Sequence, residues 1–236
     1  MSRVSIIILL FLAYLFTIDT RAVDYVQVFG SSYTKAVKLA NARKLDIFDE
    51  LENYKVNKKL LLAVVFPELL RYKYLQDKIE TLALKVFFIN LGYDYANFSI
   101  GLFQMKPSFV IRLENEILQQ SKYVQKRFGF LNHIIKDNKE YREQIVERLE
   151  IFEWQVKYLA IFYYLVKNKF NKEISNLSLR EKVIFFACAY NVGYTKSFRK
   201  IMKWKDVAYF PYGKFAASGQ RQFIYSDISW NFYQNL

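Results

Sequence analysis

The chain has few of the residues that turns, disulfide bonds and most metal sites require. Its 236 residues include only 7 Gly, 3 Pro, 1 Cys and 1 His. Sandwiches, barrels and propellers place Gly and Pro at their many short turns, so this scarcity argues against an all-β architecture. One cysteine excludes an intrachain disulfide bond and a zinc site built from cysteines. Because there is also only one histidine, carboxylates are the remaining metal ligands, and we expect neither a metal ion nor another cofactor.

The composition instead favours a folded and mostly helical protein. Hydrophobic residues make up 53% of the chain and aromatic residues 19%, which is too apolar for a disordered chain despite its charge. The length of 236 residues suits a single domain with an insertion. Apolar residues recur mainly at the helical spacing of three or four positions. The predicted fold class is therefore all-α.

The N-terminal segment is typical of an export signal. Val4–Ile18 is a run of 15 residues without a charge, and Arg3 precedes it. A membrane-spanning helix needs about 20 apolar residues, whereas the apolar part of a signal peptide needs about 7–15. Thr20 and Ala22 provide small side chains at the positions that a signal peptidase requires. We therefore expect residues 1–22 to be a cleaved signal peptide, with an uncleaved N-terminal anchor as the alternative.

The mature domain is then residues 23–236, exported to the periplasm or the cell envelope. The whole chain has 35 Lys and Arg against 22 Asp and Glu, a net charge of +13. An exported basic protein is expected to meet an anionic cell-envelope surface, although the same charge also serves solubility alone. No nucleic-acid-binding motif accompanies the charge, so we expect no specific nucleic acid partner.

Capping residues and apolar periodicity predict the helices. Ser32 is a candidate N-cap, Gly92 suits the position after a helix, and Pro107 suits the first turn of the next one. The apolar row from Tyr141 to Val166 predicts one continuous helix of about 27 residues, roughly 40 Å long. Helices are expected over about 32–53, 58–66, 77–91 and 179–191, with a helical insertion over about 114–175 and a short helix or extended arm after 209.

Glu68 is the first candidate for a chemical role. It follows the apolar run Leu60–Phe66, and no cation is near it in the sequence before Arg71. A carboxyl group in apolar surroundings is poorly solvated when charged, so its pKa rises, as a general acid requires. Pro67 is expected to end or kink the preceding helix and so turn the carboxylate into a cleft. Alternatively, Pro67 begins a helix with Glu68 in its first turn, where the helix dipole favours an acidic residue.

Two further segments have the composition of ligand-binding turns. Ser99 to Pro107 (SIGLFQMKP) combines a turn at Gly101, the amide of Gln104 and a helix start. Ala189–Gly193 (AYNVG) ends an apolar helix with a polar residue and a glycine. Taken alone, each segment is also consistent with an ordinary helix boundary.

Taken in order, the three segments resemble the soluble lytic transglycosylases and their goose-type lysozyme relatives, which are cell-wall glycosidases. The resemblance rests on Glu68 after an apolar run, then on Gly101–Pro107 (G-L-x-Q-x-x-P), then on Ala189–Gly193 (A-Y-N-x-G). It spans about residues 60 to 200. It implies a lysozyme-like fold, here enlarged by the helical insertion.

The resemblance also implies the roles of individual residues. Glu68 would be the single catalytic acid and base, and Tyr190 would hydrogen-bond near it and orient it. The expected substrate-binding residues are Ser99, Gly101, Gln104 and Asn191. The implied reaction cleaves the bond between N-acetylmuramic acid and N-acetylglucosamine in peptidoglycan and leaves a 1,6-anhydro end.

The chain departs from the family pattern at identifiable places. Leu69 stands where the family usually has Ser, and the later Thr-Arg-x-Tyr type of motif is not evident, although Tyr225-Ser226-Asp227 is a candidate for similar space. A hydrolase would need a second carboxylate. Asp94, at the start of the loop that leads to Gly101, is the candidate for it. One clear acid favours transglycosylation over hydrolysis.

The sequence therefore predicts an exported lytic transglycosylase whose partners are peptidoglycan glycan strands and the anionic envelope. Muramidase-type hydrolysis remains open. The alternative function is a non-catalytic, peptidoglycan-binding lysozyme-like module of a secretion or conjugation machine.

Overall fold

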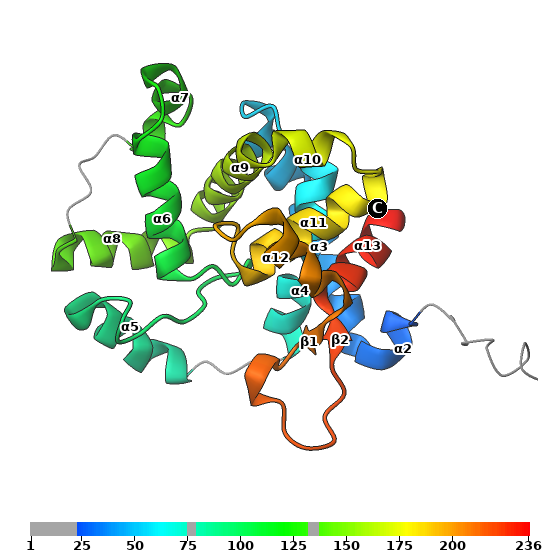
Figure 1. Cartoon of the computed structure of the whole chain (residues 1–236). Helices are drawn as coiled ribbons and strands as arrows, with labels where there is room; N and C mark the ends of the chain where they lie inside the picture. The colour runs from blue at the N-terminus through cyan, green and yellow to red at the C-terminus, as the bar shows by residue number, and fades with distance from the viewer. Residues whose placement is uncertain (1–22, 75–78, 132–136) are drawn as a thin grey trace, which may run out of the picture.

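A computed structural model describes residues 23–74, 79–131 and 137–236. Over these residues the protein is mostly helical, which confirms the predicted class (Figure 1). The expected signal peptide, residues 1–22, lies outside them. The helices are α2 (Tyr25–Phe29), α3 (Ser31–Glu52), α4 (Lys58–Tyr74), α5 (Ile79–Leu91), α6 (Pro107–Leu118), α7 (Lys122–Arg127), α8 (Lys139–Glu150), α9 (Phe152–Lys169), α10 (Asn171–Ser175), α11 (Leu179–Val192), α12 (Phe198–Met202) and α13 (Tyr225–Gln234).

The remaining regular structure is short. Three single turns of 3-10 helix cover Gly129–Leu131, Lys203–Asp206 and Gly213–Phe215. The strands β1 (Ala208–Phe210) and β2 (Phe223–Ile224) pair antiparallel in a two-stranded sheet. This pair was not expected from the sequence, whereas the short helix near the C terminus was. None of the described helices is both long and apolar enough to cross a membrane.

Most of the predicted helix boundaries are confirmed within a few residues. Gly92 follows α5 with φ +88°, and Pro107 is the first residue of α6. Gly193 follows α11 with φ +95°. Ser32 is not the N-cap of its helix, because α3 begins one residue earlier, directly after Gly30.

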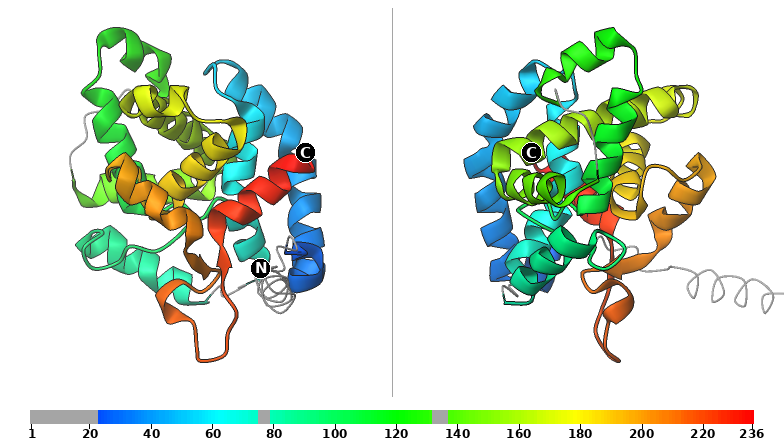
Figure 2. Two further views of the ribbon diagram at one scale, coloured as in Figure 1. Left: turned by 45° about the vertical axis from the view of Figure 1, so that its right-hand side comes forward. Right: turned by 90° about the vertical axis from the view of Figure 1, so that its left-hand side faces the viewer.

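Helix α4 lies within the hydrophobic core and holds Glu68. Every residue from Leu61 to Leu70 is buried, and the helix packs against α3, α11 and α13 (Figure 2). Pro67 lies inside α4, which continues to Tyr74. The expectation that Pro67 ends one helix or begins another is therefore wrong. Burial on all sides outweighs the roughly 3 kcal/mol that an internal proline costs a helix.

The predicted continuous helix over Tyr141 to Val166 is also wrong, because the chain turns at Ile151. Ile151 lies between the last residue of α8 and the first residue of α9, and its backbone is extended, with ψ 124°. The apolar row is continuous in sequence, but its two halves share only part of their partners. Both helices contact α6, whereas α8 also contacts α5 and α9 also contacts α3 and α11. These additional partners favour a corner over one straight helix.

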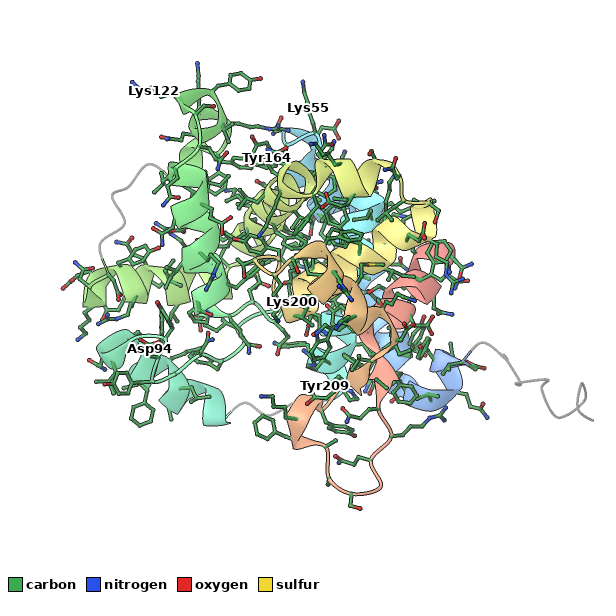
Figure 3. All side chains as sticks on the ribbon, viewed as in Figure 1. Lys55, Asp94, Lys122, Tyr164, Lys200 and Tyr209 are labelled. Carbon is green, nitrogen blue, oxygen red and sulfur yellow. The ribbon has the colours of Figure 1, made fainter. Side chains whose placement is uncertain are left out.

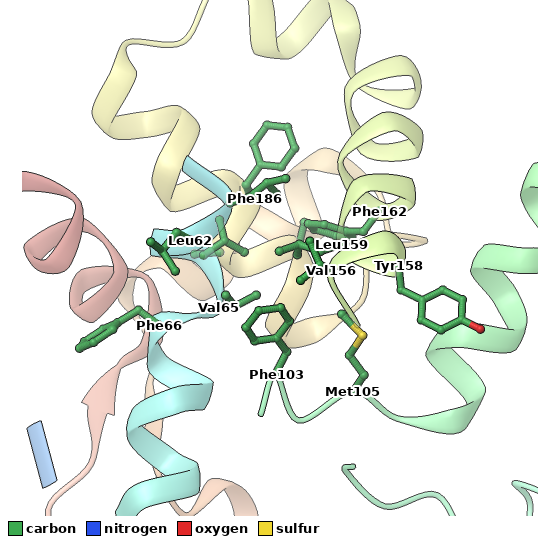
Figure 4. Close-up of a cluster of buried hydrophobic side chains, with 14 of the residues drawn as sticks. Leu62, Val65, Phe66, Phe103, Met105, Val156, Tyr158, Leu159, Phe162 and Phe186 are labelled. Carbon is green, nitrogen blue, oxygen red and sulfur yellow. The ribbon is translucent and has the colours of Figure 1, made fainter. Parts of the chain in front are cut away.

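The loop between α5 and α6 supplies side chains to the core. Phe103 and Met105 are buried, and Figure 4 shows them beside Val65 of α4 and Val156 of α9. Gln104, which lies between them in the sequence, is only partly buried. The segment thus anchors an apolar side chain in the core on each side of Gln104 and leaves the polar one at the surface of the core.

A buried carboxylate connects three helices of the expected insertion. Glu114 of α6 is fully buried, and its oxygens accept hydrogen bonds from Tyr141 at 2.8 Å and Tyr158 at 2.5 Å. Arg148 of α8 donates to the same carboxylate at 3.0 Å. Buried charges are tolerated when they are paired and hydrogen-bonded in this way.

Replacing Glu114 with Leu is expected to lower the free energy of unfolding by about 3–5 kcal/mol, because it removes the carboxylate that a half-buried guanidinium and two buried hydroxyl groups bond. The measurement is chemical denaturation followed by circular dichroism. The control is Glu147→Leu, an exposed position on α8, where the expected change is within about 0.5 kcal/mol. Equal effects at the two positions would contradict the prediction.

Candidate active site

The segment Ser99 to Pro107 forms a tight turn closed by a pair of backbone hydrogen bonds. The amide of Ile100 donates to the Met105 carbonyl at 2.9 Å, and the amide of Met105 donates back at 3.1 Å. Inside this bridge, Gly101 has φ +74° and Gln104 has φ +48°. A left-handed conformation is uncommon for a residue other than glycine, and such residues concentrate at functional sites. The Gln104 amide donates to the Gly101 carbonyl at 2.7 Å, which holds the turn closed.

The identity of Gly101 follows from a close approach to α9. A Cβ atom at this position would lie 1.8 Å from Nε2 of Gln155 and 2.6 Å from the Leu149 carbonyl oxygen. Gln155 is itself buried; its Oε1 accepts from the Phe103 amide at 2.8 Å and its Nε2 donates to the Leu149 carbonyl at 2.8 Å. One amide group therefore joins the turn to the corner between α8 and α9.

The turn forms one wall of a cavity of about 380 Å³. The cavity brings together five of the residues singled out in the sequence, which come from α4, the turn and the end of α11. These residues are Glu68, Ser99, Gln104, Tyr190 and Asn191. Lys106, directly before α6, and Ser108, Phe109 and Arg112 in its first turns also line the cavity. Segments more than 120 positions apart in the chain thus meet around one carboxyl group.

Two other predicted site residues are placed differently. Gly101 shapes the turn and supplies the carbonyl that Gln104 bonds, but it is not among the residues that line the cavity. Asp94 is exposed, at the periphery near the end of α5 in Figure 3, and does not line the cavity. Among the described lining residues, Glu68 is the single carboxylate.

Glu68 is 4% exposed, and burial is the largest influence on its pKa, which is raised above the ordinary value. Arg71, one turn further along α4, opposes this effect: its Nη1 lies 2.7 Å from Oε2 of Glu68. A hydrogen bond from Tyr225 and the charge of Lys106 oppose it as well. The balance leaves the pKa raised, in the direction that the sequence predicted.

Tyr225, at the start of α13, hydrogen-bonds Glu68, as Arg71 also does. Its hydroxyl also lies 3.1 Å from the Val64 carbonyl, to which it can donate. A hydroxyl group has one proton, so Tyr225 donates to the carbonyl when Glu68 is protonated and to the carboxylate when Glu68 is ionised. Tyr225 therefore accommodates both protonation states of Glu68.

The hydroxyl group of Tyr190 bonds a backbone carbonyl rather than the carboxyl group of Glu68, and its orienting role stays a prediction. Its hydroxyl donates to the Phe103 carbonyl at 2.8 Å. The two residues are nonetheless close, since both line the cavity. The pKa of Tyr190 is raised by burial first and then by the nearby charge of Glu68. Tyr190 therefore fixes the turn that faces the carboxyl group, whereas Tyr225 fixes the carboxyl group itself.

From the sequence, Arg71 was only the nearest cation after Glu68, and neither Tyr225 nor Gln155 had an assigned role. The guanidinium of Arg71 lies 5.0 Å from the ring centroid of Phe210 in β1, so a residue of the unexpected strand pair supports it. No cluster of three or more potential metal-ligating side chains occurs in the part of the chain that the structure describes. The described residues that line the cavity offer one carboxyl group, hydroxyl and amide groups, and cations.

Comparison with known proteins gives no relative: no family model, no curated protein and no solved structure matches this chain. The interpretation of the cavity therefore rests on its own geometry and on the sequence motifs.

Gly101→Ala is expected to destabilise the protein by about 2 kcal/mol or more, since the new methyl group meets Gln155 and adds to the strain of a positive φ. Gly219→Ala is the matched control, because Gly219 has φ +84° with nothing within 4 Å of the added atom. The control isolates the backbone strain, about 1–2 kcal/mol. Thermal unfolding of the two variants measures the difference, and a Gly101 variant no less stable than the control would refute the contact.

The raised pKa of Glu68 makes stability depend on pH in a defined direction. The folded state retains a proton that the unfolded chain releases near the ordinary value of 4.5. Between that value and the raised folded pKa, the folded protein binds more protons, so this group's contribution to stability falls as pH rises. Denaturant titrations from pH 4 to 8 should show the stability of the protein falling relative to Glu68→Gln. A difference that is constant, or of opposite slope, would contradict a raised pKa.

Proposed function

We propose that this protein is a lytic transglycosylase that cleaves peptidoglycan glycan strands, on a lysozyme-like fold enlarged by the insertion over about 114–175. The observation that carries the proposal is the single buried carboxyl group of Glu68 on the wall of a cavity, with its pKa raised by burial. The amide of Gln104 and the polar residues Ser99 and Asn191 line the same cavity. A buried acid that faces polar, hydrogen-bonding groups suits a sugar substrate.

In this proposal Glu68 first acts as the general acid. It donates its proton to the glycosidic oxygen between N-acetylmuramic acid and N-acetylglucosamine, and the bond to the muramic C1 breaks. Tyr225 then turns its hydroxyl toward the new carboxylate and stabilises it. As a base, the carboxylate takes the proton of the muramic 6-hydroxyl group as that oxygen attacks C1, which gives the 1,6-anhydro product. Glu68 regains its proton, so the cycle closes without water.

The absence of a second carboxylate from the described cavity wall favours this route over hydrolysis, which uses a pair of carboxyl groups. Asp94, the earlier candidate for such a partner, is exposed and away from the wall. The proposed location remains the periplasm or the cell envelope, with the anionic envelope attracting the basic surface.

One observation favours the second candidate function, a peptidoglycan-binding module without activity. Arg71 lies 2.7 Å from Glu68, and an ion pair stabilises the ionised carboxylate, which has no proton to donate. If this ion pair keeps Glu68 ionised when glycan is bound, the cavity would bind a strand and leave it intact. The balance between burial and this pair therefore separates the two functions.

Digestion of purified peptidoglycan, with the soluble fragments read by mass spectrometry, tests the proposal. The protein is expected to release anhydro-muropeptides, and Glu68→Gln is expected to lose at least about 10²-fold in rate because the proton donor is gone. Glu153→Gln makes the same chemical change at an exposed position and should leave the rate unchanged. Products with reducing ends would indicate hydrolysis instead. Wall binding without any release would indicate the non-catalytic module.

A further inference from the structure

More cations than carboxylates line the cavity around Glu68. Arg71, Lys106 and Arg112 all line it, and Glu68 is the single carboxylate among the described lining residues. The three cations give the cavity wall a net positive charge of two when Glu68 is ionised and of three when it is protonated. An excess of cations in a concave site attracts an anion and raises its local concentration.

The three cations are distributed along the cavity. Arg71 contacts Glu68 directly at 2.7 Å, and the charge of Lys106 acts on Glu68. Burial and Glu116 raise the pKa of Tyr194, which lines the cavity after α11, and the charge of Arg112 opposes them, so Arg112 lies near that wall. The cations are thus spread from the acid toward the wall that Tyr194 lines.

Two of these cations form no ion pair within the described structure, although Glu116 lies one turn along α6 from Arg112 and acts on the same Tyr194. Other cations of the chain do, as Arg142 pairs with Asp137 and Arg148 pairs with Glu114. No carboxylate of the described residues lies within ion-pair distance of Lys106 or Arg112. Both side chains are exposed, so a ligand can reach them.

Arg71 also has hydrogen-bonding capacity to spare. A guanidinium group has five N–H donors in a planar fork that matches a carboxylate. In Arg71, Nη1 donates to Glu68, whereas the buried Nε has no partner among the described residues. Leaving a buried donor unsatisfied costs free energy. A rearrangement of Arg71 toward a second anion would remove that cost and release Glu68 from its counter-cation.

We propose that the cavity recognises a carboxylate on its glycan substrate, through Arg71, Lys106 and Arg112. This inference rests on the proposed function and specifies its substrate class: an anionic glycan rather than a neutral one with the same backbone. Peptidoglycan offers carboxylates from two sources, the lactyl group of a muramic residue that has no peptide and the stem peptide where one is attached. Chitin oligomers have the same β-1,4 backbone of N-acetylated sugars without either group.

The test measures binding, separately from cleavage, by titration calorimetry at low salt with Glu68→Gln, which prevents turnover. The probes are peptide-free glycan strands with free lactyl carboxylates, peptide-bearing strands and chitin oligomers of equal sugar number. At least one anionic probe is expected to bind about tenfold or more tightly than chitin. Tighter binding of the peptide-free strand identifies the lactyl carboxylate as the ligand, whereas tighter binding of the peptide-bearing strand alone identifies the stem peptide.

Charge-removing variants assign the effect to the cavity. Lys106→Gln and Arg112→Gln, each added to Glu68→Gln, should reduce the advantage of the anionic probe, and both together with Arg71→Gln should abolish it. Lys122→Gln is the matched control, because this exposed lysine is the first residue of α7, away from the cavity (Figure 3). The control should leave the advantage unchanged, and circular dichroism verifies that each variant is folded.

Several results would overturn the inference. Equal binding of chitin and both anionic strands would do so, as would an advantage that survives the removal of all three cations, or that single-stranded DNA competes away as effectively as glycan does. Charge-independent glycan binding by a protein that degrades peptidoglycan would reject the inference and leave the proposed function standing. Failure to bind any glycan, together with failure to degrade peptidoglycan, would reject both.

Discussion

A single buried amide, that of Gln155, connects the candidate site to the rest of the molecule. Its oxygen holds the Phe103 amide and its nitrogen holds the Leu149 carbonyl, each at 2.8 Å. A buried amide that loses either partner leaves polar groups unsatisfied, at about 1–3 kcal/mol each. The turn and the corner between α8 and α9 therefore hold each other in place, and Gly101 is the residue that lets them approach.

The same constraint explains why Gln104 faces the cavity. Phe103 and Met105 are anchored in the core on either side of it, and the bridge between Ile100 and Met105 closes the turn. Tyr190 adds a hydrogen bond to the Phe103 carbonyl from α11. The turn is thus held by side chains from two helices and by its own backbone, which is how a left-handed Gln104 persists despite its strain.

Opposing influences set the properties of Glu68. Burial in α4 raises its pKa, while Arg71, Tyr225 and Lys106 lower it. Burial alone would give an acid that rarely ionises and acts poorly as a base. The ion pair alone would give a carboxylate without a proton. A group that must donate and then accept a proton requires an intermediate balance, and Tyr225 supports both states.

The sequence predicted the parts of this site that depend on local chemistry. Glu68, the turn with Gly101 and Gln104, and the glycine that ends α11 each follow from short-range preferences, and each lies where such preferences place it. Tyr225 and Gln155 did not follow, because each acts through a contact with a segment distant in sequence. The helical periodicity over Tyr141 to Val166 correctly predicted helix on both sides of Ile151. It could not predict the corner there, because periodicity shows which face of a helix is apolar and not what that face packs against.

The helices between the two sequence motifs, Gly101–Pro107 and Ala189–Gly193, hold the cavity wall in place. Glu114 lies on α6, whose first turns line the cavity wall, and its buried carboxylate holds Tyr141 and Arg148 of α8 and Tyr158 of α9. Helix α9 in turn carries Gln155, which holds the turn. The cavity wall is thereby fixed twice to the same two helices, once through a charge and once through an amide. Loosening either attachment would move Lys106 and Arg112 relative to Glu68, because these bonds position the turn and α6, whereas α4, which holds Glu68, is packed against α3, α11 and α13.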